Sequence, residues 1–105
     1  MQNTTIHIKR ELQLTADGSH TLFIPEMDEH YHSVNGAVQE SRHVFIEAGL
    51  HHLERREITI LEIGFGTGLN AFLTLLDAEA CQRKIHYCSI ELYPLGTDVI
   101  ESLNY

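Results

Sequence analysis

Cysteine and proline are scarce in this sequence, and long hydrophobic runs are missing. The two cysteines, Cys81 and Cys88, form no CxxC pair, which excludes a disulfide framework and a paired-cysteine zinc motif and leaves two reduced thiols. The two prolines, Pro25 and Pro94, form no linker. No segment approaches the roughly 18–20 apolar residues of a membrane span, and residues 1–12 lack the apolar stretch of a signal peptide. We therefore expect a cytoplasmic protein with no membrane partner.

Basic residues are also few. Seven Lys and Arg stand against fifteen Asp and Glu, which gives a formal net charge of −8. The eight histidines add positive charge only near or below pH ~6.5. Since a nucleic-acid-binding protein normally carries a basic face, the charge of this chain as a whole argues against such a partner.

The composition is nevertheless that of a globular domain. The chain has 105 residues, of which 43% are hydrophobic, and this fits one domain and excludes general disorder. No internal repeat or low-complexity segment interrupts it. The order of the predicted elements, given next, indicates the α/β class.

An N-terminal β-hairpin is predicted by the alternation of apolar and polar residues over residues 6–14. The apolar members of this alternation are Ile6, Ile8, Leu12 and Leu14. The pair Asp17 and Gly18 is typical of a tight hairpin turn, and residues 21–24 supply the returning strand. The polar residues 25–36 predict a loop.

A helix is predicted to begin at Ala37 and to end near Gly49. Its expected apolar face consists of Val38, Val44, Phe45 and Ala48. The almost continuously apolar residues 58–63 then predict a strand buried on both faces, as in a parallel sheet. After it we expect a glycine-rich turn over residues 64–68.

The rest of the chain continues the same β–turn–α pattern. Apolar residues at helical spacing predict an amphipathic helix over residues 69–76. Residues 85–91 predict a second strand, and residues 95–103 predict the start of another helix.

The glycine-rich turn is the segment that indicates a ligand-binding site. Glycines allow positive φ angles and leave no Cβ, so a ligand can lie against the backbone. The helix that follows presents free N–H groups and a positive dipole end. Glu91, at the end of the second strand, can accept hydrogen bonds from the hydroxyls of a ribose. Together these features predict a cofactor that contains adenosine, bound at the carboxyl edge of a parallel sheet.

Two registers of the glycines remain open. The register that begins at Gly64 gives an acid-led GxGxG pattern, with Glu62 before it, as in S-adenosylmethionine methyltransferases. The register Gly66-Gly68-Ala71 satisfies the dinucleotide fingerprint and would indicate an oxidoreductase that uses NAD or FAD. A strand end near Ile63 favours the first register.

Four segments resemble one bacterial family: DGSxTL at 17–22, YHSxxGA at 31–37, ESxHVF at 40–45, and GFGTGLN at 64–70. The sequence is similar to the N-terminal part of the MnmD-type tRNA methyltransferases, which also form the methyltransferase half of bifunctional MnmC. The resemblance implies methyl transfer from S-adenosylmethionine to the amine of 5-aminomethyl-2-thiouridine, at the wobble position of tRNA.

The resemblance also implies which residues bind the cofactor. Gly64, Gly66 and Gly68 would line its methionine part, and Glu91 would hold its ribose. Tyr31 and the segment 40–45 would cover the cofactor or shape its pocket. The remaining positions of the motif assigned to this site are Glu62, Phe65, Thr67 and Asn70.

The chain departs from the family in one respect. The family carries an aspartate-led motif after a later strand, and nothing in this sequence matches it. The catalytic residue therefore stays unidentified. We interpret residues 1–57 as an N-terminal extension of hairpin, loop and helix. We interpret residues 58–105 as the first β–α–β–α half of a Rossmann-like domain that is truncated and inactive alone.

This interpretation fixes the expected partners. Contacts with tRNA would be made by an absent and basic C-terminal half, which would reconcile the acidic charge with a nucleic-acid substrate. An exposed sheet edge beside Ile60 could instead recruit a second copy, so a non-catalytic, self-associating fragment is another hypothesis. The histidine pairs His30/His32 and His51/His52 are interpreted as solvated or pocket-edge residues, and no metal site is predicted.

Overall fold

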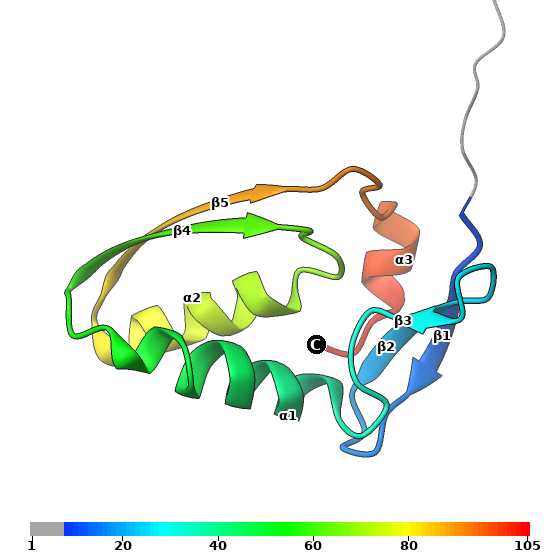
Figure 1. The fold of residues 1–105 in the computed structure, drawn as a ribbon, viewed down its shortest axis with the longest axis horizontal. Helices are drawn as coiled ribbons and strands as arrows, with labels where there is room; N and C mark the ends of the chain where they lie inside the picture. Colours follow the sequence, from blue (N-terminus) through cyan, green and yellow to red (C-terminus); the bar gives the residue numbers. More distant parts are fainter. Residues whose placement is uncertain (1–7) are drawn as a thin grey trace, which may run out of the picture.

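The computed structural model describes residues 8–105 and has a mixed α/β architecture (Figure 1). A three-stranded antiparallel sheet, in the order β1-β2-β3, forms one end of the molecule. A two-stranded parallel sheet, β4-β5, lies over a layer of helices at the other. The predicted α/β class is therefore confirmed.

The predicted hairpin is present, with a wider connection than expected. Strand β1 (Glu11–Leu14) pairs antiparallel with β2 (His20–Ile24), which in turn pairs with β3 (Glu29–His30). Leu14 lies opposite His20, so a five-residue loop replaces the predicted two-residue turn. Ile8 precedes β1, and the predicted strand position Ile6 lies outside the described residues.

This five-residue loop caps the helix α1 (Ala37–Ser41), which follows much later in the sequence. Gly36 precedes the helix with a φ of 153° and provides no side chain to cap it. Instead, the N–H of Ala37 donates to Thr15 Oγ1 (3.0 Å) and the N–H of Val38 donates to Ser19 Oγ (3.0 Å). The hairpin loop therefore satisfies helix amides that would otherwise be unpaired.

A third loop residue, Asp17, completes this cap. Its Oδ2 accepts a hydrogen bond from the N–H of Gln39 (2.9 Å). Desolvation raises the pKa of Asp17, but hydrogen bonds from Ser19, Gln39 and Thr15 together outweigh it and hold the pKa well below the ordinary 3.8. The charged carboxylate is thus the form that the fold favours.

Replacing Asp17 with alanine is expected to lower the free energy of unfolding by about 1–2 kcal/mol, because α1 loses a capping acceptor. The loss should appear as a lower urea midpoint at neutral pH. Asp17→Asn keeps an acceptor oxygen and should lose less.

The stability that Asp17 contributes depends on pH in a direction that its pKa determines. The folded-state pKa of Asp17 is depressed, so its stabilising effect is complete above the ordinary 3.8 and fades as the pH falls below that value. The gap in stability between the wild type and Asp17→Asn should therefore narrow on acidification. Equal urea midpoints at neutral pH, or a gap that widens in acid, would contradict this account.

Helix α1 continues directly into a π-helical stretch, η1 (Arg42–Glu47), and a 3₁₀ turn follows, η2 (Leu50–His52). The wide turn is marked by a hydrogen bond from the N–H of Ala48 to the carbonyl of His43 (2.9 Å). The buried positions of this segment are Ala37, Ser41, Ile46 and Leu50. The spacing of five between the second and third of them follows from the π-helical turn.

This spacing explains an error in the predicted helix face. Val38 and Phe45 do pack against the core, as expected. Val44 and Ala48 are exposed, because the π-helical turn rotates them away from it. A regular α-helical period therefore predicted half of the face correctly.

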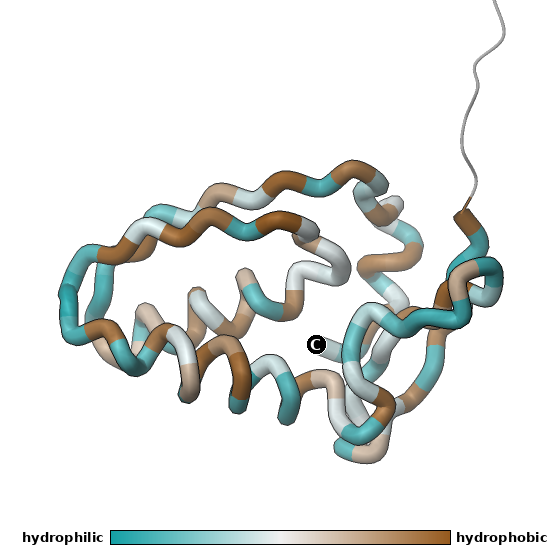
Figure 2. Tube along the Cα trace, viewed as in Figure 1, coloured by the Kyte–Doolittle hydropathy of each residue, from teal (hydrophilic) through white to brown (hydrophobic). Residues whose placement is uncertain are grey.

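The second sheet consists of β4 (Glu57–Ile63) and β5 (Lys84–Ile90), which pair in parallel and are connected by helix α2 (Leu69–Cys81). Figure 2 shows hydrophobic residues recurring along both strands. Ile58 is buried against Leu69 and Leu73 of α2 and against the α1–η2 segment.

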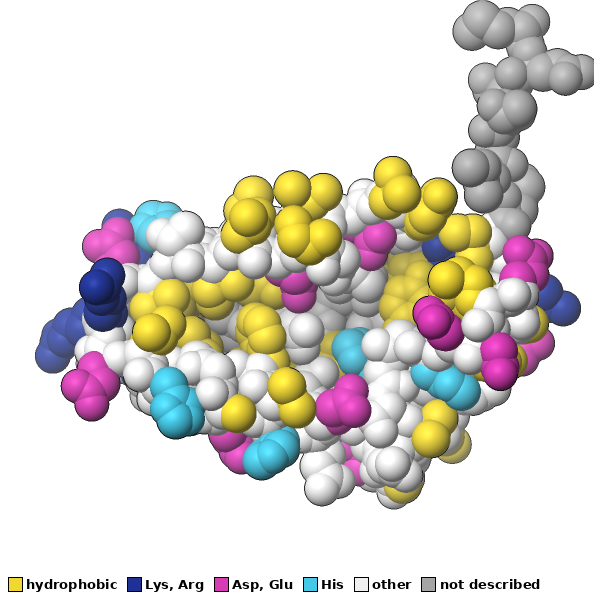
Figure 3. Space-filling view, in the orientation of Figure 1, with side chains coloured by type: hydrophobic (Ala, Val, Ile, Leu, Met, Phe, Trp, Pro, Cys, Tyr) yellow, Lys and Arg dark blue, Asp and Glu magenta, His cyan; other side chains and the backbone are white. Residues whose placement is uncertain are grey.

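The opposite face of this sheet is exposed to solvent. The prediction that residues 58–63 are buried on both faces is therefore wrong. The exposed apolar side chains on or beside this face are Leu61, Ile63, Ile90 and Leu92. Figure 3 shows hydrophobic side chains gathered along the upper rim of the molecule, where β4 and β5 lie in Figure 1. The continuous hydrophobic run reflects this second apolar face, which no element among residues 8–105 covers.

The end of the chain folds back onto the hairpin. Helix α3 (Thr97–Ser102) follows β5, and the last residues lie beside the hairpin loop (Figure 1). Asn104 donates to the carbonyl of Gly18 (2.8 Å), and the hydroxyl of Tyr105 donates to the carbonyl of His20 (2.7 Å). None of the helices within residues 8–105 is long and apolar enough to cross a membrane.

Candidate functional site

The glycine-rich turn lies where the predicted strand ends. The N–H of Gly64 donates to the carbonyl of Ile90 (2.7 Å) as the last link between β4 and β5. Gly64, Gly66 and Gly68 have φ angles of 90°, 58° and 80°. Residues that carry a Cβ are strained in this left-handed region. The path of the backbone therefore requires the alternating glycines.

Glu91, directly after β5, is tied to this turn. Its Oε1 accepts a hydrogen bond from the N–H of Gly66 (2.7 Å), and its Oε2 accepts one from the N–H of Tyr93 (3.1 Å). Each carboxylate oxygen can accept a second hydrogen bond. The carboxylate therefore fixes the turn and keeps acceptor capacity for a ligand.

Tyr31 lies against the other side of the turn. A Cβ placed on Gly66 would be 3.3 Å from Cδ2 of the Tyr31 ring, so the backbone and the ring are in close contact. The hydroxyl of Tyr31 accepts a hydrogen bond from Nε of Arg10 (2.9 Å). By contrast, a Cβ on Gly64 would meet no atom within 4 Å, so this part of the turn has open space in front of it.

These residues surround a cavity of about 570 Å³. It is bounded by the glycine turn, the end of β5, the α1–η1 segment and the β2–β3 region. The residues that line it are Ile8, Ile24, Met27, Tyr31, His32, Glu40, Ser41, Val44, Phe45, Gly64, Phe65, Gly66, Asn70, Glu91 and Tyr93. Six of the residues assigned to the site from sequence are among them: Tyr31, Gly64, Phe65, Gly66, Asn70 and Glu91.

The other three assigned residues lie behind the cavity wall. Glu62 is buried, and its carboxylate accepts hydrogen bonds from Ser89 Oγ (2.9 Å) and from Asn70 Nδ2 (3.5 Å). Thr67 is buried, and Gly68 precedes the first residue of α2. These residues hold the turn and Asn70 in place.

His32 lines the cavity, in agreement with its interpretation as a pocket-edge residue, but sequence reasoning missed its contact with the glycine turn. Its Nε2 is 2.9 Å from Thr67 Oγ1, which joins the loop before α1 to the glycine turn. Burial lowers the pKa of His32, although the nearby carboxylates of Glu40 and Glu62 oppose this effect. The imidazole at the cavity is therefore neutral at neutral pH. Ile24, the last residue of β2, and Met27, in the turn that follows it, were also missed, because they come from a distant part of the chain.

The charges around the cavity are acidic. The charged side chains that line it are those of Glu40 and Glu91, and no Lys or Arg lines it within the described part of the chain. Exposed basic residues, Arg55, Arg56 and Lys84, lie at the end of the sheet where β4 and β5 begin (Figure 3). The cavity therefore favours a ligand with positive charge near its walls.

The chain is similar in sequence to known proteins. No protein-family model matches it. It is 36% identical over 99 residues to the tRNA 5-methylaminomethyl-2-thiouridine biosynthesis bifunctional protein MnmC of Magnetococcus marinus, covering 89% of this chain and 14% of the relative. It is 38% identical over 85 residues to the MnmC of Burkholderia multivorans, covering 74% of this chain and 13% of that protein.

A solved structure supports the same relationship to the MnmC proteins. The crystal structure of MNMC2 from Aquifex aeolicus matches 85% of this chain and 31% of its own chain, with a TM-score of 0.74 and 34% sequence identity. The chain thus spans about one seventh of the curated relatives and about a third of this structure. The resemblance predicted from the motifs is confirmed.

Proposed function

We propose that this chain, which is homologous to a segment of the MnmC proteins, binds S-adenosylmethionine and takes part in methyl transfer to a tRNA. The proposed acceptor is the amine of 5-aminomethyl-2-thiouridine at the wobble position. One observation carries the proposal: Gly64 and Gly66, two of the three alternate glycines with positive φ angles, and the carboxylate of Glu91 line a single cavity.

The residues present fit this cofactor. The space in front of Gly64, which a Cβ would enter, allows the methionine part to lie against the backbone. Glu91 would accept hydrogen bonds from the ribose hydroxyls with its remaining lone pairs. Tyr31 and Phe45, which both line the cavity, would enclose the cofactor.

Charge supports this cofactor over a dinucleotide. S-adenosylmethionine carries a positive sulfonium and a positive ammonium group, which suit walls that contain Glu40 and Glu91. The pyrophosphate of NAD or FAD is negative and would lie among these carboxylates. Only the N–H groups at the start of α2 would offset that repulsion.

The position of the strand end supports the same choice. β4 ends at Ile63, so Gly64 directly follows the strand, as the acid-led register requires. In the dinucleotide register the first glycine would be Gly66, and the last position would be Ala71, which does not line the cavity.

The chain's contribution to the reaction is binding and exclusion of water. When bound, S-adenosylmethionine supplies an electrophilic methyl group to a neutral amine. The ring of Phe65 and the apolar side chains of Val44 and Phe45 would limit water at that position. The neutral imidazole of His32 adds no positive charge that would repel the sulfonium.

A calorimetric titration tests the proposal. We expect S-adenosylhomocysteine, the product of the cofactor, to bind the 105-residue chain saturably with one site. NAD should show no saturable binding under the same conditions. Binding of NAD without binding of S-adenosylhomocysteine would overturn the methyltransferase proposal in favour of an oxidoreductase.

A further inference from the structure

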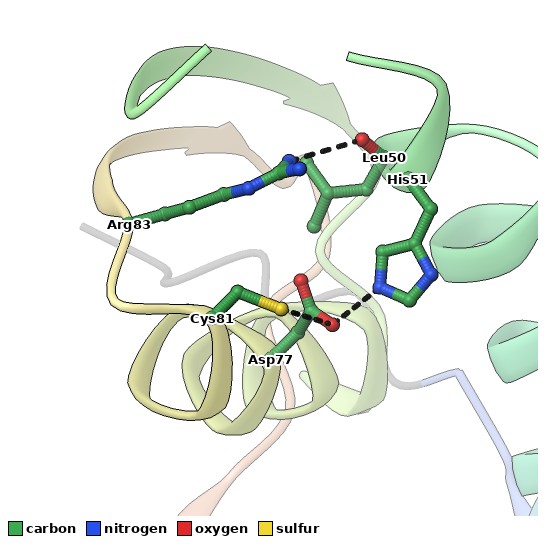
Figure 4. A network of polar contacts seen from close by, with 5 residues as sticks. All are labelled: Leu50, His51, Asp77, Cys81 and Arg83. Atoms are coloured by element: carbon green, nitrogen blue, oxygen red, sulfur yellow. Dashed lines mark hydrogen bonds and ion pairs between the residues drawn. The ribbon is translucent and has the colours of Figure 1, made fainter. Parts of the chain in front are cut away.

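A second polar cluster lies at the far end of α2, away from the glycine turn (Figure 4). It consists of His51 from η2 and of Asp77 and Cys81 from α2. His51 Nε2 is 2.5 Å from Asp77 Oδ1, and Cys81 Sγ is 3.8 Å from the same oxygen. A nitrogen, an oxygen and a sulfur thus face one point, with these three atoms within 4.8 Å of one another.

The carboxylate of Asp77 is the central member of this cluster. Its side chain is only 11% exposed. Its second oxygen, Oδ2, is buried and has no hydrogen-bond partner among residues 8–105. A buried carboxylate oxygen without a partner is costly, and a cation bound at Oδ1, between His51 and Cys81, would offset this cost by neutralising the charge of the carboxylate.

We propose that His51, Asp77 and Cys81 form a binding site for a divalent transition-metal ion of the zinc class. Thiolate, imidazole and carboxylate are all established zinc ligands, whereas Mg²⁺ and Ca²⁺ prefer sites made of oxygens alone. A thiolate and a carboxylate together balance the charge of a divalent ion. Binding replaces the thiol proton of Cys81, which is released to solvent.

The surrounding structure brings these side chains together before any ion binds, and the hydrogen bond between His51 and Asp77 opens when the ion enters. Asp77 and Cys81 are four residues apart on α2, so they project from the same face of the helix. Arg83 donates a hydrogen bond to the carbonyl of Leu50 (3.2 Å), which holds η2 close to α2 (Figure 4). His51 and Cys81 are partly open to solvent, so water can supply the fourth ligand.

The site is separate from the proposed cofactor cavity. Helix α2 has 13 residues, and at 1.5 Å per residue its two ends are about 18–20 Å apart. The glycine turn lies at one end and the metal ligands lie at the other. The ion therefore has a structural role: it joins η2 to the end of α2.

Cobalt(II) is the direct probe for this site. Titration of the metal-free chain with Co²⁺ should give one equivalent of binding, with the visible bands of a tetrahedral ion and a thiolate-to-cobalt charge-transfer band. Zn²⁺ should displace it and remove both signals. Absence of saturable Co²⁺ binding would overturn the proposal and leave His51 and Asp77 as a simple hydrogen-bonded pair.

Matched variants identify the ligands. Cys81→Ser should remove the charge-transfer band, and Asp77→Asn and His51→Gln should each weaken Co²⁺ binding at least about tenfold. Cys88→Ser and His52→Gln are the controls, because they change the other cysteine and the neighbouring histidine. Circular dichroism checks that each variant folds. A charge-transfer band that survives Cys81→Ser but not Cys88→Ser would refute the assignment.

A second readout measures the structural role. At a free Zn²⁺ concentration of about 100 times the dissociation constant, the melting temperature should rise by about 10 °C. Cys81→Ser should reduce this rise, and Cys88→Ser should not. An equal rise in both variants would show that zinc binds elsewhere.

Discussion

Gly64→Ala is expected to weaken the binding of S-adenosylhomocysteine at least about fivefold. The new methyl group would meet no protein atom within 4 Å, so it would project into the cavity where the cofactor is proposed to lie. Crowding of this kind typically costs about 1–3 kcal/mol, which lowers the affinity about 5–150-fold. Calorimetric titration of the variant measures the loss.

Gly18→Ala is the matched control for this substitution. Gly18 has a φ of 84°, close to the 90° of Gly64, and a Cβ there would also meet nothing within 4 Å. Both variants should lose about 1 kcal/mol of stability from the left-handed backbone. Only Gly64→Ala should lose affinity. Equal affinity in the two variants would mean that the ligand does not lie against Gly64.

Glu91→Gln is the second substitution with a large expected effect. Glutamine keeps a carbonyl oxygen that can accept the hydrogen bond from the N–H of Gly66, so the turn should stay in place. It loses the charge and one acceptor oxygen, and hydrogen bonds to charged groups contribute about 1.5–3 kcal/mol. We expect affinity for S-adenosylhomocysteine to fall about 10–100-fold with little change in melting temperature.

Glu40→Gln separates a specific contact from a general charge effect. Glu40 also lines the cavity, but from α1 instead of the strand end. Its neutralisation should change affinity much less than that of Glu91. Equal losses in the two variants would indicate that the cavity selects its ligand by charge alone and that Glu91 holds no ribose.

The part of the site that sequence could predict is local in the chain. A run of β-branched residues, alternate glycines and a helical repeat follow each other within residues 58–76, and each constrains its own backbone. Glu91 could be added because parallel strands end at the same edge of a sheet. The structure places Glu91 against Gly66, in agreement with that reasoning.

The parts that sequence could not predict depend on contacts between distant residues. Thr15, Asp17 and Ser19 cap a helix that begins at Ala37, so the cap is invisible to any local pattern. The π-helical turn in η1 changes the helical period by one residue, which moves Val44 out of the core.

The metal cluster gave no sequence signal for the same reason. His51 lies 26 positions before Asp77, and the spacing of Asp77 and Cys81 on one helix is not a zinc motif by itself. Packing of η2 against the end of α2 brings the three side chains together. The single cysteine that takes part could only be interpreted as a reduced thiol.

Mapping the bound ligand by NMR tests the central proposal most directly. When S-adenosylhomocysteine is added to the ¹⁵N-labelled chain, the largest amide shifts should occur at Gly64, Gly66 and Glu91. Residues at the far end of α2, such as Asp77, should stay unchanged. Shifts confined to other surfaces, with the three amides of the turn unmoved at saturation, would contradict the proposed cofactor site.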